Sequence, residues 1–419
     1  MVREHIDALR DAMRRRGALD ALAPTIDRAV ALDKSRRETI QAVEERKAAR
    51  NAVSQQVGQR KRAGESADDL QHQSRALGDE IARLDHELAQ TEAELSSILL
   101  ELPNVTLEQV PAGGEENNAA VRTWGEPRHG ARVQPHWEIG TRLGLIDFER
   151  GAKISGSGFI VYRKTGARLV RALMNLMLDV HTADHGYEET WVPVVVNRAS
   201  MTGTAQLPKF EEDMYSLRDD EGFLIPTAEV PITNLYRDEI IPEAELPKAF
   251  TAYSPCFRRE AGAAGKDTRG LLRVHEFDKV ELVRYVTPER SGDELELLTG
   301  HAEKILQLLE LPYRVVRLAS GDTGFASAHT YDLETFAPGV GKWLEVSSCS
   351  NFTDFQARRA NIRYKPVDGG KPRFVHTLNG SGLAFPRIIA SILEHHQQED
   401  GSVRVPSALR TYLGAERLT

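Results

Sequence analysis

A heptad pattern between Leu70 and Leu102 limits what this chain can fold into more than any other feature. Ten positions, spaced alternately four and three residues apart, carry eight apolar side chains. They are Leu70, Ser74, Leu77, Ile81, Leu84, Leu88, Thr91, Leu95, Ile98 and Leu102. A seam with this spacing packs against a second helix in a coiled coil. The pattern therefore predicts a long helix with a helical partner along its length.

The preceding segment, from about Ile26 to Arg62, supplies that partner. Its apolar seam is weaker and runs through Ala29, Leu32, Val43, Val53 and Val57. Gly58 and Gly64 bracket a turn between the two segments. Two helices joined by a short turn lie side by side and antiparallel, so residues 1–104 are predicted to form a long helical hairpin.

The two arms of this hairpin carry opposite charge. Residues 34–62 have a net charge of +6 and residues 67–102 a net charge of −7. One interpretation is attraction between neighbouring helices. The other is a patch that contacts phosphates near the tip, made of Arg46, Lys47, Arg50, Arg60, Lys61 and Arg62. Because the whole chain has a net charge of −8, any contact with a nucleic acid must come from such a local patch.

The remaining sequence mixes strands and helices. Pro103 ends the second helix, and glycines, prolines and polar residues predict a linker over 105–135. In residues 136–419, helices are expected from Gly166 and over 289–309. Strands are expected over 189–196, 223–230, 313–318, 330–333 and 342–347, and a strand, glycine turn and helix over 376–394. Pro193 points to a strand edge or bulge, a place suited to a subunit interface.

These elements predict an α+β domain with a mostly antiparallel sheet flanked by helices. The sequence has no phosphate-binding loop of the Walker type and no Gly-x-Gly-x-x-Gly that opens a helix. The chain is therefore not expected to be a doubly wound nucleotide-binding protein.

A hairpin over 257–281 carries the densest chemistry. On extended strands, Arg258 shares a face with Glu260, and Phe277 shares one with Lys279 and Glu281. A guanidinium, an aromatic ring and carboxylates on one face suit a nucleotide with an anionic centre. The alternative from local composition is a surface hairpin with incidental ion pairs.

The cellular setting follows from a few absences in the sequence. Cys256 and Cys349 are the only cysteines, and their spacing offers neither a zinc motif nor a disulfide framework. The N-terminal residues are charged, and no apolar run reaches the ~18 residues of a membrane span. A cytoplasmic protein without a membrane anchor is expected.

Five stretches together resemble the bacterial seryl-tRNA synthetases, a family of class II aminoacyl-tRNA synthetases. They are GTAQLPKFEEDMY (203–215), PTAEVPITN (226–234), FRREAGAAGKDTRGLLRVHEFDKVEL (257–282), EVSSCSNFTDFQARR (345–359) and HTLNGSGLAFPR (376–387). The resemblance extends over nearly the whole chain, including the helical hairpin. It implies a class II catalytic domain over 136–419 and a tRNA-binding arm over 1–104.

The resemblance implies a function and a set of site residues. The activity would be serine–tRNA ligation: ATP activates L-serine to seryl-adenylate, and serine then passes to the terminal adenosine of tRNA(Ser), and also of tRNA(Sec). Serine would be bound by Thr227, Ala228, Glu229, Glu281, Asn379 and Ser381. ATP would be bound by Arg258, Arg259, Glu260, Val274, Phe277, Glu345, Val346, Ser347, Ser348 and Arg387.

Within that set, the resemblance gives several residues a specific task. Arg258 would contact the serine carboxylate and the α-phosphate, Phe277 would stack on adenine, and Arg387 would face the γ-phosphate. Glu345 and Ser348 would hold Mg²⁺. Strand alternation instead pairs Glu345 with Ser347, so either serine remains open as the metal contact unless a bulge intervenes.

The resemblance also implies binding partners, and three alternatives remain open. The family resemblance implies a homodimer, with Pro193 near the interface, and the six cations of the arm as tRNA contacts. One alternative is a ligase that loads an amino acid onto a carrier protein, whose close relatives lack a long tRNA arm. Another is a non-catalytic paralogue, and a third is a specialised duplicate with the same activity.

Overall fold

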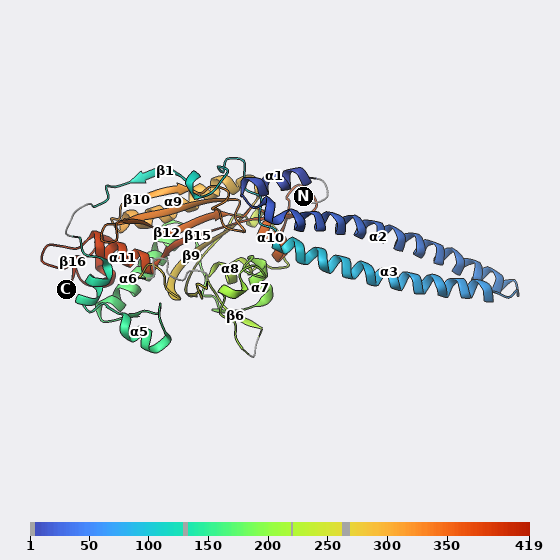
Figure 1. Cartoon of the computed structure of the whole chain (residues 1–419), viewed down its shortest axis with the longest axis horizontal. Helices are drawn as coiled ribbons and strands as arrows, with labels where there is room; N and C mark the ends of the chain where they lie inside the picture. The colour runs from blue at the N-terminus through green and yellow to red at the C-terminus, as the bar shows by residue number, and fades with distance from the viewer. Residues whose placement is uncertain (1–4, 129–132, 219–220, 262–268) are drawn as a thin grey trace. The chain divides into compact units, whose positions relative to one another are not determined.

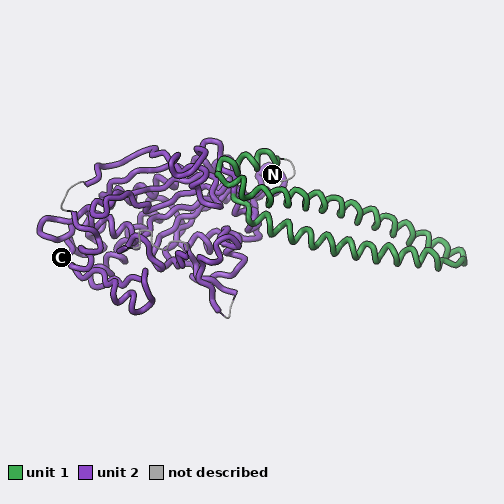
Figure 2. The backbone as a smooth tube through the Cα atoms, in the orientation of Figure 1, with its two compact units in different colours: residues 1–103 green, residues 104–419 purple. Residues whose placement is uncertain are grey.

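The computed structural model describes residues 5–128, 133–218, 221–261 and 269–419. The chain divides into two compact units, Met1–Pro103 and Asn104–Thr419, which are coloured separately in Figure 2. Each described helix is too short or too polar to span a bilayer.

Unit 1 is a helical hairpin preceded by a short helix, as Figure 1 shows. The helices are α1 (Ile6–Arg15), α2 (Leu19–Arg62) and α3 (Asp68–Glu101). The predicted seams are buried at Ala29, Leu32, Val43 and Val53 of α2 and at Leu70, Ile81 and Leu84 of α3. The hairpin prediction is confirmed, although α2 begins earlier than expected and contains Pro24.

Oppositely charged side chains of the two arms form ion pairs with one another. Arg46 lies 3.0 Å from Glu80, Lys47 lies 3.5 Å from Asp85, and Arg60 lies 3.0 Å from Asp69. The first interpretation of the charge split, attraction between the helices, therefore holds for half of the six predicted tRNA-binding cations. Among the described residues, none forms an ion pair with Arg50 or Lys61.

Unit 2 is built on an eight-stranded sheet that is antiparallel except at one edge. The strands, in spatial order, are β1 (Ala119–Trp124), β10 (Tyr313–Arg317), β11 (His329–Ala337), β12 (Lys342–Asn351), β15 (His376–Ala384), β9 (Glu276–Val286), β8 (Lys248–Phe257) and β4 (Glu188–Glu189). The α+β prediction is confirmed. The linker prediction for 105–135 is wrong in one respect, because β1 lies within it and pairs with β10.

Helices cover one face of this sheet (Figure 1). They are α4 (His136–Arg142), α6 (Thr165–Asp179), α9 (Ser291–Leu308), α11 (Phe385–His395) and α12 (Arg410–Leu413). Their apolar side chains form one core with inward-facing strand residues such as Val280, Leu282 and Leu378. The β9 residues that alternate with Val280 and Leu282 therefore point to the other face of the sheet.

Smaller elements surround the sheet. The remaining helices are α5 (Phe148–Ser155), α7 (Arg198–Gly203), α8 (Glu229–Thr233) and α10 (Phe355–Ala360). The short pairings are β2 (Ile146–Asp147) with β3 (Val161–Tyr162), β5 (Val195–Asn197) with β6 (Gly222–Leu224), β7 (Ile240–Pro242) with β13 (Arg363–Lys365) and β14 (Arg373–Phe374), and β16 (Val403–Arg404) with β17 (Arg417–Leu418).

Three strand predictions need correction, each because of proline or glycine. The strand over 223–230 ends at Leu224, before Pro226, and helix α8 starts at Glu229. The strand over 189–196 is interrupted around Pro193, leaving β4 and β5. The glycine turn over 376–394 is no turn: Gly380 lies inside β15, where an added Cβ would lie 2.3 Å from Leu298 Cδ2.

Candidate functional site

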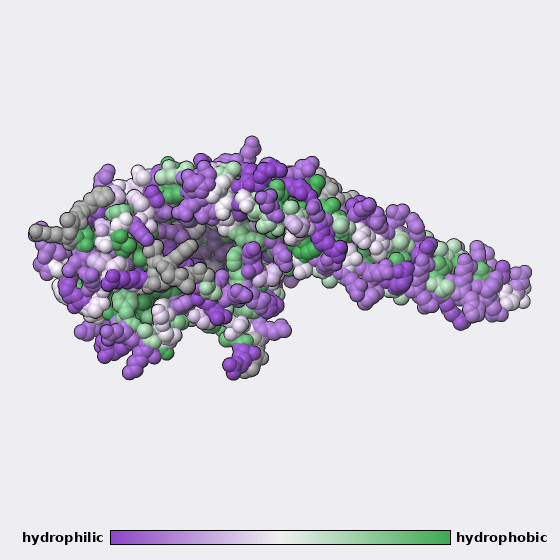
Figure 3. Space-filling view, in the orientation of Figure 1, coloured by the Kyte–Doolittle hydropathy of each residue, from purple (hydrophilic) through white to green (hydrophobic). Residues whose placement is uncertain are grey.

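A cleft of about 740 Å³ opens in unit 2, over strands β9, β12 and β15. In the space-filling view it is a hollowed, hydrophilic region (Figure 3). The predicted residues that line it are Thr227, Glu229, Arg258, Glu260, Val274, Phe277, Glu345, Val346, Ser348, Asn379, Ser381 and Arg387. The residues named from the family resemblance thus come together in one cleft from four of the five matched stretches.

Four predicted residues are not part of that lining. Ala228 is buried in the second apolar core, and Arg259 donates its backbone N–H to the carbonyl of Asp213. Ser347 is buried and donates its hydroxyl to the carbonyl of Ser381 over 2.8 Å. Glu281 is fully buried, but it hydrogen-bonds two lining residues and so forms the layer beneath the cleft surface.

Strand β9 positions the centre of the cleft by simple alternation. Phe277 and Lys279 line the cleft, whereas Val280 and Leu282 belong to the core on the opposite face. This confirms the predicted orientation of the strand. Arg258 and Glu260 do not lie on an extended strand as predicted, because β8 ends at Phe257 and Glu260 has a φ of +51°, in the left-handed region. Glu260 still lines the cleft, where it forms an ion pair with Arg273.

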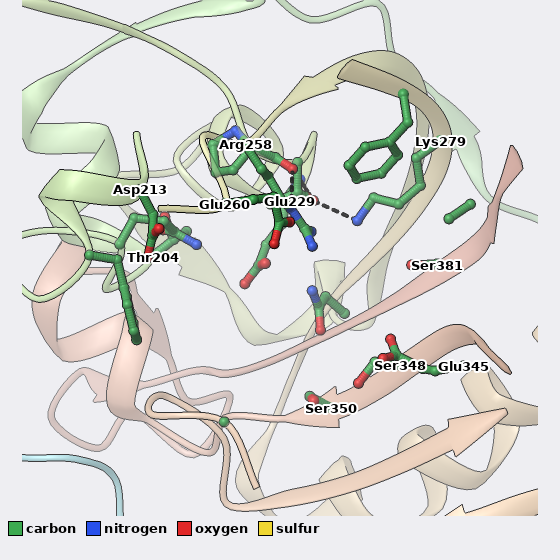
Figure 4. Close-up of a pocket in the computed structure, with 18 of the residues that line it drawn as sticks. Thr204, Asp213, Glu229, Arg258, Glu260, Lys279, Glu345, Ser348, Ser350 and Ser381 are labelled. Carbon is green, nitrogen blue, oxygen red and sulfur yellow. Dashed lines mark hydrogen bonds between the residues drawn. The ribbon is translucent and has the colours of Figure 1, made fainter. Parts of the chain in front are cut away.

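A buried polar cluster adjoins the cleft, and its members Glu229 and Lys279 are labelled in Figure 4. The hydroxyl of Thr227 donates to Glu281 Oε2 over 3.1 Å and accepts from Lys279 Nζ over 2.8 Å. Lys279 also pairs with Glu281, and Asn379 Nδ2 donates to Glu281 Oε1 over 3.1 Å. Glu281 is therefore satisfied by a cation, a hydroxyl and an amide.

Glu229 belongs to the same cluster, and among the described residues it forms no ion pair, although the charges of Lys279 and Arg258 act to lower its pKa. Its Oε1 accepts from Gln356 Nε2 over 2.6 Å. Burial, and then the charge of Glu281, raise the pKa of Glu229 to about 7. The ammonium of Lys279 pairs with Glu281, which leaves the carboxyl group of Glu229 as a partner suited to the α-ammonium of an amino acid.

Cationic groups lie towards the rest of the cleft. Arg258 lies over the ring of Phe277, with the guanidinium carbon 5.1 Å from the ring centroid, and its Nε donates to the carbonyl of Pro226 over 3.3 Å. Arg387, in the first turn of α11, donates through Nη1 to the carbonyl of Glu345 over 2.7 Å. Two guanidiniums with donors to spare can bind carboxylate and phosphate groups.

A β-bulge settles which serine accompanies Glu345. On β12, Leu333 pairs with Ser347 and Glu334 pairs with Glu345, so Val346 is the extra residue. Beyond the bulge the parity is shifted, and Ser348 lines the cleft together with Glu345. The strict alternation that paired Glu345 with Ser347 is wrong for this reason.

The oxygen atoms around Glu345 and Ser348 are of the kind that bind magnesium. Asp332 lies opposite Ser348 in the strand pairing, and its Oδ1 is buried without a hydrogen-bond partner among the described residues. Burial, and then the charge of Glu345, raise the pKa of Asp332 well above its ordinary value. Carboxylate and hydroxyl oxygens are hard donors that fit a divalent cation that keeps some of its waters, and Glu345 also lies 3.5 Å from Arg387 Nη1. Within the described ranges, no three His, Cys, Asp or Glu residues form a complete metal cage.

Sequence reasoning assigned no role to several lining residues. Lys279 was placed on the correct face, but its contact with Thr227 joins positions 52 residues apart. Another wall comes from Thr204, Gln206, Phe210 and Asp213, inside the stretch 203–215 that the family resemblance had matched. A further wall, Gly324–Ser327, lies between two strands and gave no local signal.

Comparisons with known proteins agree with this geometry. Residues 1–106 match the seryl-tRNA synthetase N-terminal domain, and residues 209–396 match the tRNA synthetase class II core domain (G, H, P, S and T). The serine–tRNA ligase of Gemmatimonas aurantiaca is 66% identical over 99% of this chain and 98% of its own. That of Geobacillus kaustophilus is 58% identical over 93% of this chain and 92% of its own.

A solved structure extends the agreement to three dimensions. Seryl-tRNA synthetase from Pyrococcus horikoshii, complexed with ATP, is 36% identical, with a TM-score of 0.95 over 100% of this chain and 98% of its own. With full-length relatives well above 30% identity and a common architecture throughout, the chain belongs to the seryl-tRNA synthetase family of class II aminoacyl-tRNA synthetases.

Proposed function

We propose that serine–tRNA ligation, the activity of this family, takes place in the cleft of unit 2 with the residue roles set out below. L-Serine and ATP react to give seryl-adenylate and pyrophosphate, and serine is then transferred to the 3′-terminal adenosine of tRNA(Ser). The observation that carries the assignment is the carboxylate cluster around Glu229 and Glu281, which faces the same cleft as Arg258 and Arg387.

Serine binds at the carboxylate end. Glu229 and Thr227 receive the α-ammonium, while Glu281, Asn379 and Ser381 surround the side-chain hydroxyl. A pocket of polar groups rejects alanine because those groups would be left without hydrogen-bond partners. The buried position of Glu229 and Glu281 supports this role, since water cannot replace the missing partner there.

Activation joins two anions. A carboxylate oxygen of serine bonds to the α-phosphorus of ATP, and the bond from that phosphorus to the bridging oxygen of pyrophosphate breaks. Arg258 contacts both reacting groups, which reduces their repulsion and aligns them. Phe277 stacks on adenine, Glu260 receives its amino group, Val274 lines the pocket, and Arg387 neutralises the departing pyrophosphate.

Mg²⁺ is proposed at Glu345 and Ser348, with Asp332 beside them. When bound, the ion supplies positive charge that stabilises the phosphates of ATP. ATP as substrate is supported by the ATP complex of the Pyrococcus horikoshii enzyme. The proposal involves no protein nucleophile. In the second step an adenosine hydroxyl bonds to the serine carbonyl carbon, the bond from that carbon to the phosphate oxygen of AMP breaks, and the hydroxyl proton passes to the departing phosphate or to water.

The arm of unit 1 is proposed to bind the tRNA. The outward cations, Arg50 and Lys61 foremost, are suited to the phosphate backbone, and recognition of this kind follows shape more than bases. Charging of tRNA(Sec) belongs to the same proposal.

A homodimer with Pro193 near the interface is supported by its exposed apolar neighbour Trp191, which is 78% exposed. A cytoplasmic location is in keeping with two buried free thiols, Cys256 and Cys349.

Serine-dependent exchange of pyrophosphate into ATP tests the first step. The account predicts exchange with serine and none with alanine, in a reaction that requires Mg²⁺ and no tRNA. Exchange that is independent of serine would refute the assignment of the cluster.

A further inference from the structure

A buried histidine far from the proposed reacting atoms is joined to the ATP end of the cleft. His136 and Glu394 are both fully buried, and His136 Nδ1 lies 2.7 Å from Glu394 Oε1. On the other side of the ring, the backbone N–H of Leu271 donates to His136 Nε2 over 3.0 Å. The three residues, named here the His136 relay, connect helix α4, helix α11 and the segment that precedes β9.

The partners fix the protonation of the ring. Since a backbone amide can only donate, Nε2 of His136 must present its lone pair, and the proton must lie on Nδ1. Nδ1 then donates to Glu394, which also accepts from the backbone N–H of His136 over 3.0 Å and of Gly339 over 2.7 Å. Glu394 thus receives three donors and holds the imidazole in one tautomer and one orientation.

The amide at the end of the relay belongs to the cleft wall. Leu271, Leu272, Arg273 and Val274 all line the cleft, and the carbonyl of Leu272 accepts from Arg387 Nε over 3.1 Å. Arg387 lies seven residues before Glu394 on α11, which is about two helical turns. Helix α11 and residues 271–272 are therefore held together at two points, by the His136 relay and by the hydrogen bond from Arg387 to Leu272.

Close packing leaves the segment little freedom to adjust. Gly270 has a φ of +69°, and a Cβ at that position would lie 2.4 Å from His136 Nε2 and 2.9 Å from Trp137 Cε3. Beside it, the guanidinium of Arg269 lies 4.6 Å from the centroid of the Trp137 ring. The chain thus returns to the cleft directly against α4, with His136 as its hydrogen-bonding contact.

We propose that His136 is a positioning residue for ATP: through the amide of Leu271 it sets where the cleft wall and Arg387 stand relative to the nucleotide. This inference rests on the proposed function. Glu394 acts one step further back, by holding the tautomer. Neither side chain lines the cleft, so neither is expected to contact a substrate.

The test compares ATP affinity across three variants. His136→Phe keeps a ring but removes both nitrogens, His136→Gln retains an acceptor and a donor, and Glu394→Gln retains the shape of the carboxylate. His396→Gln is the matched control, because His396 is also buried and its Nε2 donates to the Leu309 carbonyl over 3.0 Å, in the core and away from the cleft lining. ATP affinity is measured by calorimetry, and KM values by serine-dependent pyrophosphate exchange.

His136→Phe is expected to weaken ATP binding about tenfold, as for a lost buried hydrogen bond. The KM for serine is expected to stay unchanged, His136→Gln to recover part of the loss, and His396→Gln to lower the melting temperature without changing ATP affinity. Unchanged ATP affinity in folded His136→Phe, or an equal loss in His396→Gln, would overturn the proposal. If His136→Phe does not fold, Glu394→Gln decides by the same criterion. A wild-type protein that binds ATP but shows no serine-dependent exchange would refute the proposed function and leave the relay to be judged by calorimetry.

Discussion

The ammonium of Lys279 donates to the hydroxyl of Thr227 over 2.8 Å, inside the cleft and beside two buried carboxylates. This contact, with the ion pair between Lys279 and Glu281, matches one of the two negative charges. Glu229 is left with an amide from Gln356 as its hydrogen-bonding neighbour. This end of the cleft, at which serine is proposed to bind, can therefore accept the positive charge of the substrate's α-ammonium beside Glu229.

The first prediction concerns the ionisation of Glu229. Its pKa of about 7 implies that serine binding improves as pH rises through neutrality, because only the carboxylate attracts the α-ammonium. The KM for serine in pyrophosphate exchange is expected to fall between about pH 6 and pH 8. In Glu229→Gln this pH dependence should vanish and the KM should be high throughout. A wild-type KM that is flat over this range would contradict the role of Glu229.

The same shift predicts the sign of a stability effect. The pKa of Glu229 is raised on folding from the ordinary value of 4.5, so the folded state holds its proton over a range in which the unfolded state has lost it. Stability from this group is present below pH 4.5 and is lost as pH rises towards 7. Without serine, Glu229→Gln should therefore melt at a higher temperature than the wild type at pH 8.

The second prediction concerns Arg258. Arg258→Ala should lose serine-dependent exchange by about two to four orders of magnitude, because the proposed role of Arg258 is to contact both the serine carboxylate and the α-phosphate. Arg373, an exposed arginine paired with Glu289 at 2.8 Å, provides a control of the same residue type. Arg373→Ala should retain exchange, and near-normal exchange in Arg258→Ala would refute its assignment.

The third prediction separates two adjacent serines. Ser348→Ala should raise the Mg²⁺ concentration needed for half-maximal exchange, since Ser348 lies with Glu345 in the cleft. Ser347→Ala should instead lower the melting temperature, because it removes a buried hydrogen bond to the carbonyl of Ser381. The magnesium requirement is measured by titration in both variants. If the magnesium requirement rose in Ser347→Ala and not in Ser348→Ala, the inference that the bulge at Val346 makes Ser348 the metal contact would be wrong.

Regular stretches were predictable from sequence because periodicity determines which side chains share a face. The heptad seam located the hairpin, and alternation on β9 separated Phe277 and Lys279 from Val280 and Leu282. Irregular backbone was not predictable in this way. The bulge at Val346 reverses the parity of β12, and the left-handed φ of Glu260 turns a residue into the cleft from outside any strand.

Long-range hydrogen bonding was the second limit. Family resemblance named twelve of the residues that line the cleft, but gave no sign that Lys279 contacts Thr227 or that Glu394 holds His136. Both contacts depend on how distant segments are brought together, and no local pattern in the sequence records them.

The fourth prediction concerns the helical arm. Deleting residues 33–98 and closing the gap with a short linker should leave serine-dependent exchange intact, because every residue of the cleft lies in unit 2. Charging of tRNA(Ser) should be abolished, since the arm is proposed to supply the contacts to the tRNA backbone. In the full-length chain, Arg50→Glu with Lys61→Glu should weaken tRNA binding and flatten its salt dependence. Retained charging by the deletion variant would contradict the tRNA-binding role.

The most direct test of the whole account is aminoacylation of total tRNA with each labelled amino acid in turn, in the presence of ATP and Mg²⁺. The account predicts that serine alone is attached, that threonine and alanine are not, and that the charged species are tRNA(Ser) and tRNA(Sec). Attachment of another amino acid, or serine-dependent exchange with no transfer to any tRNA, would contradict it.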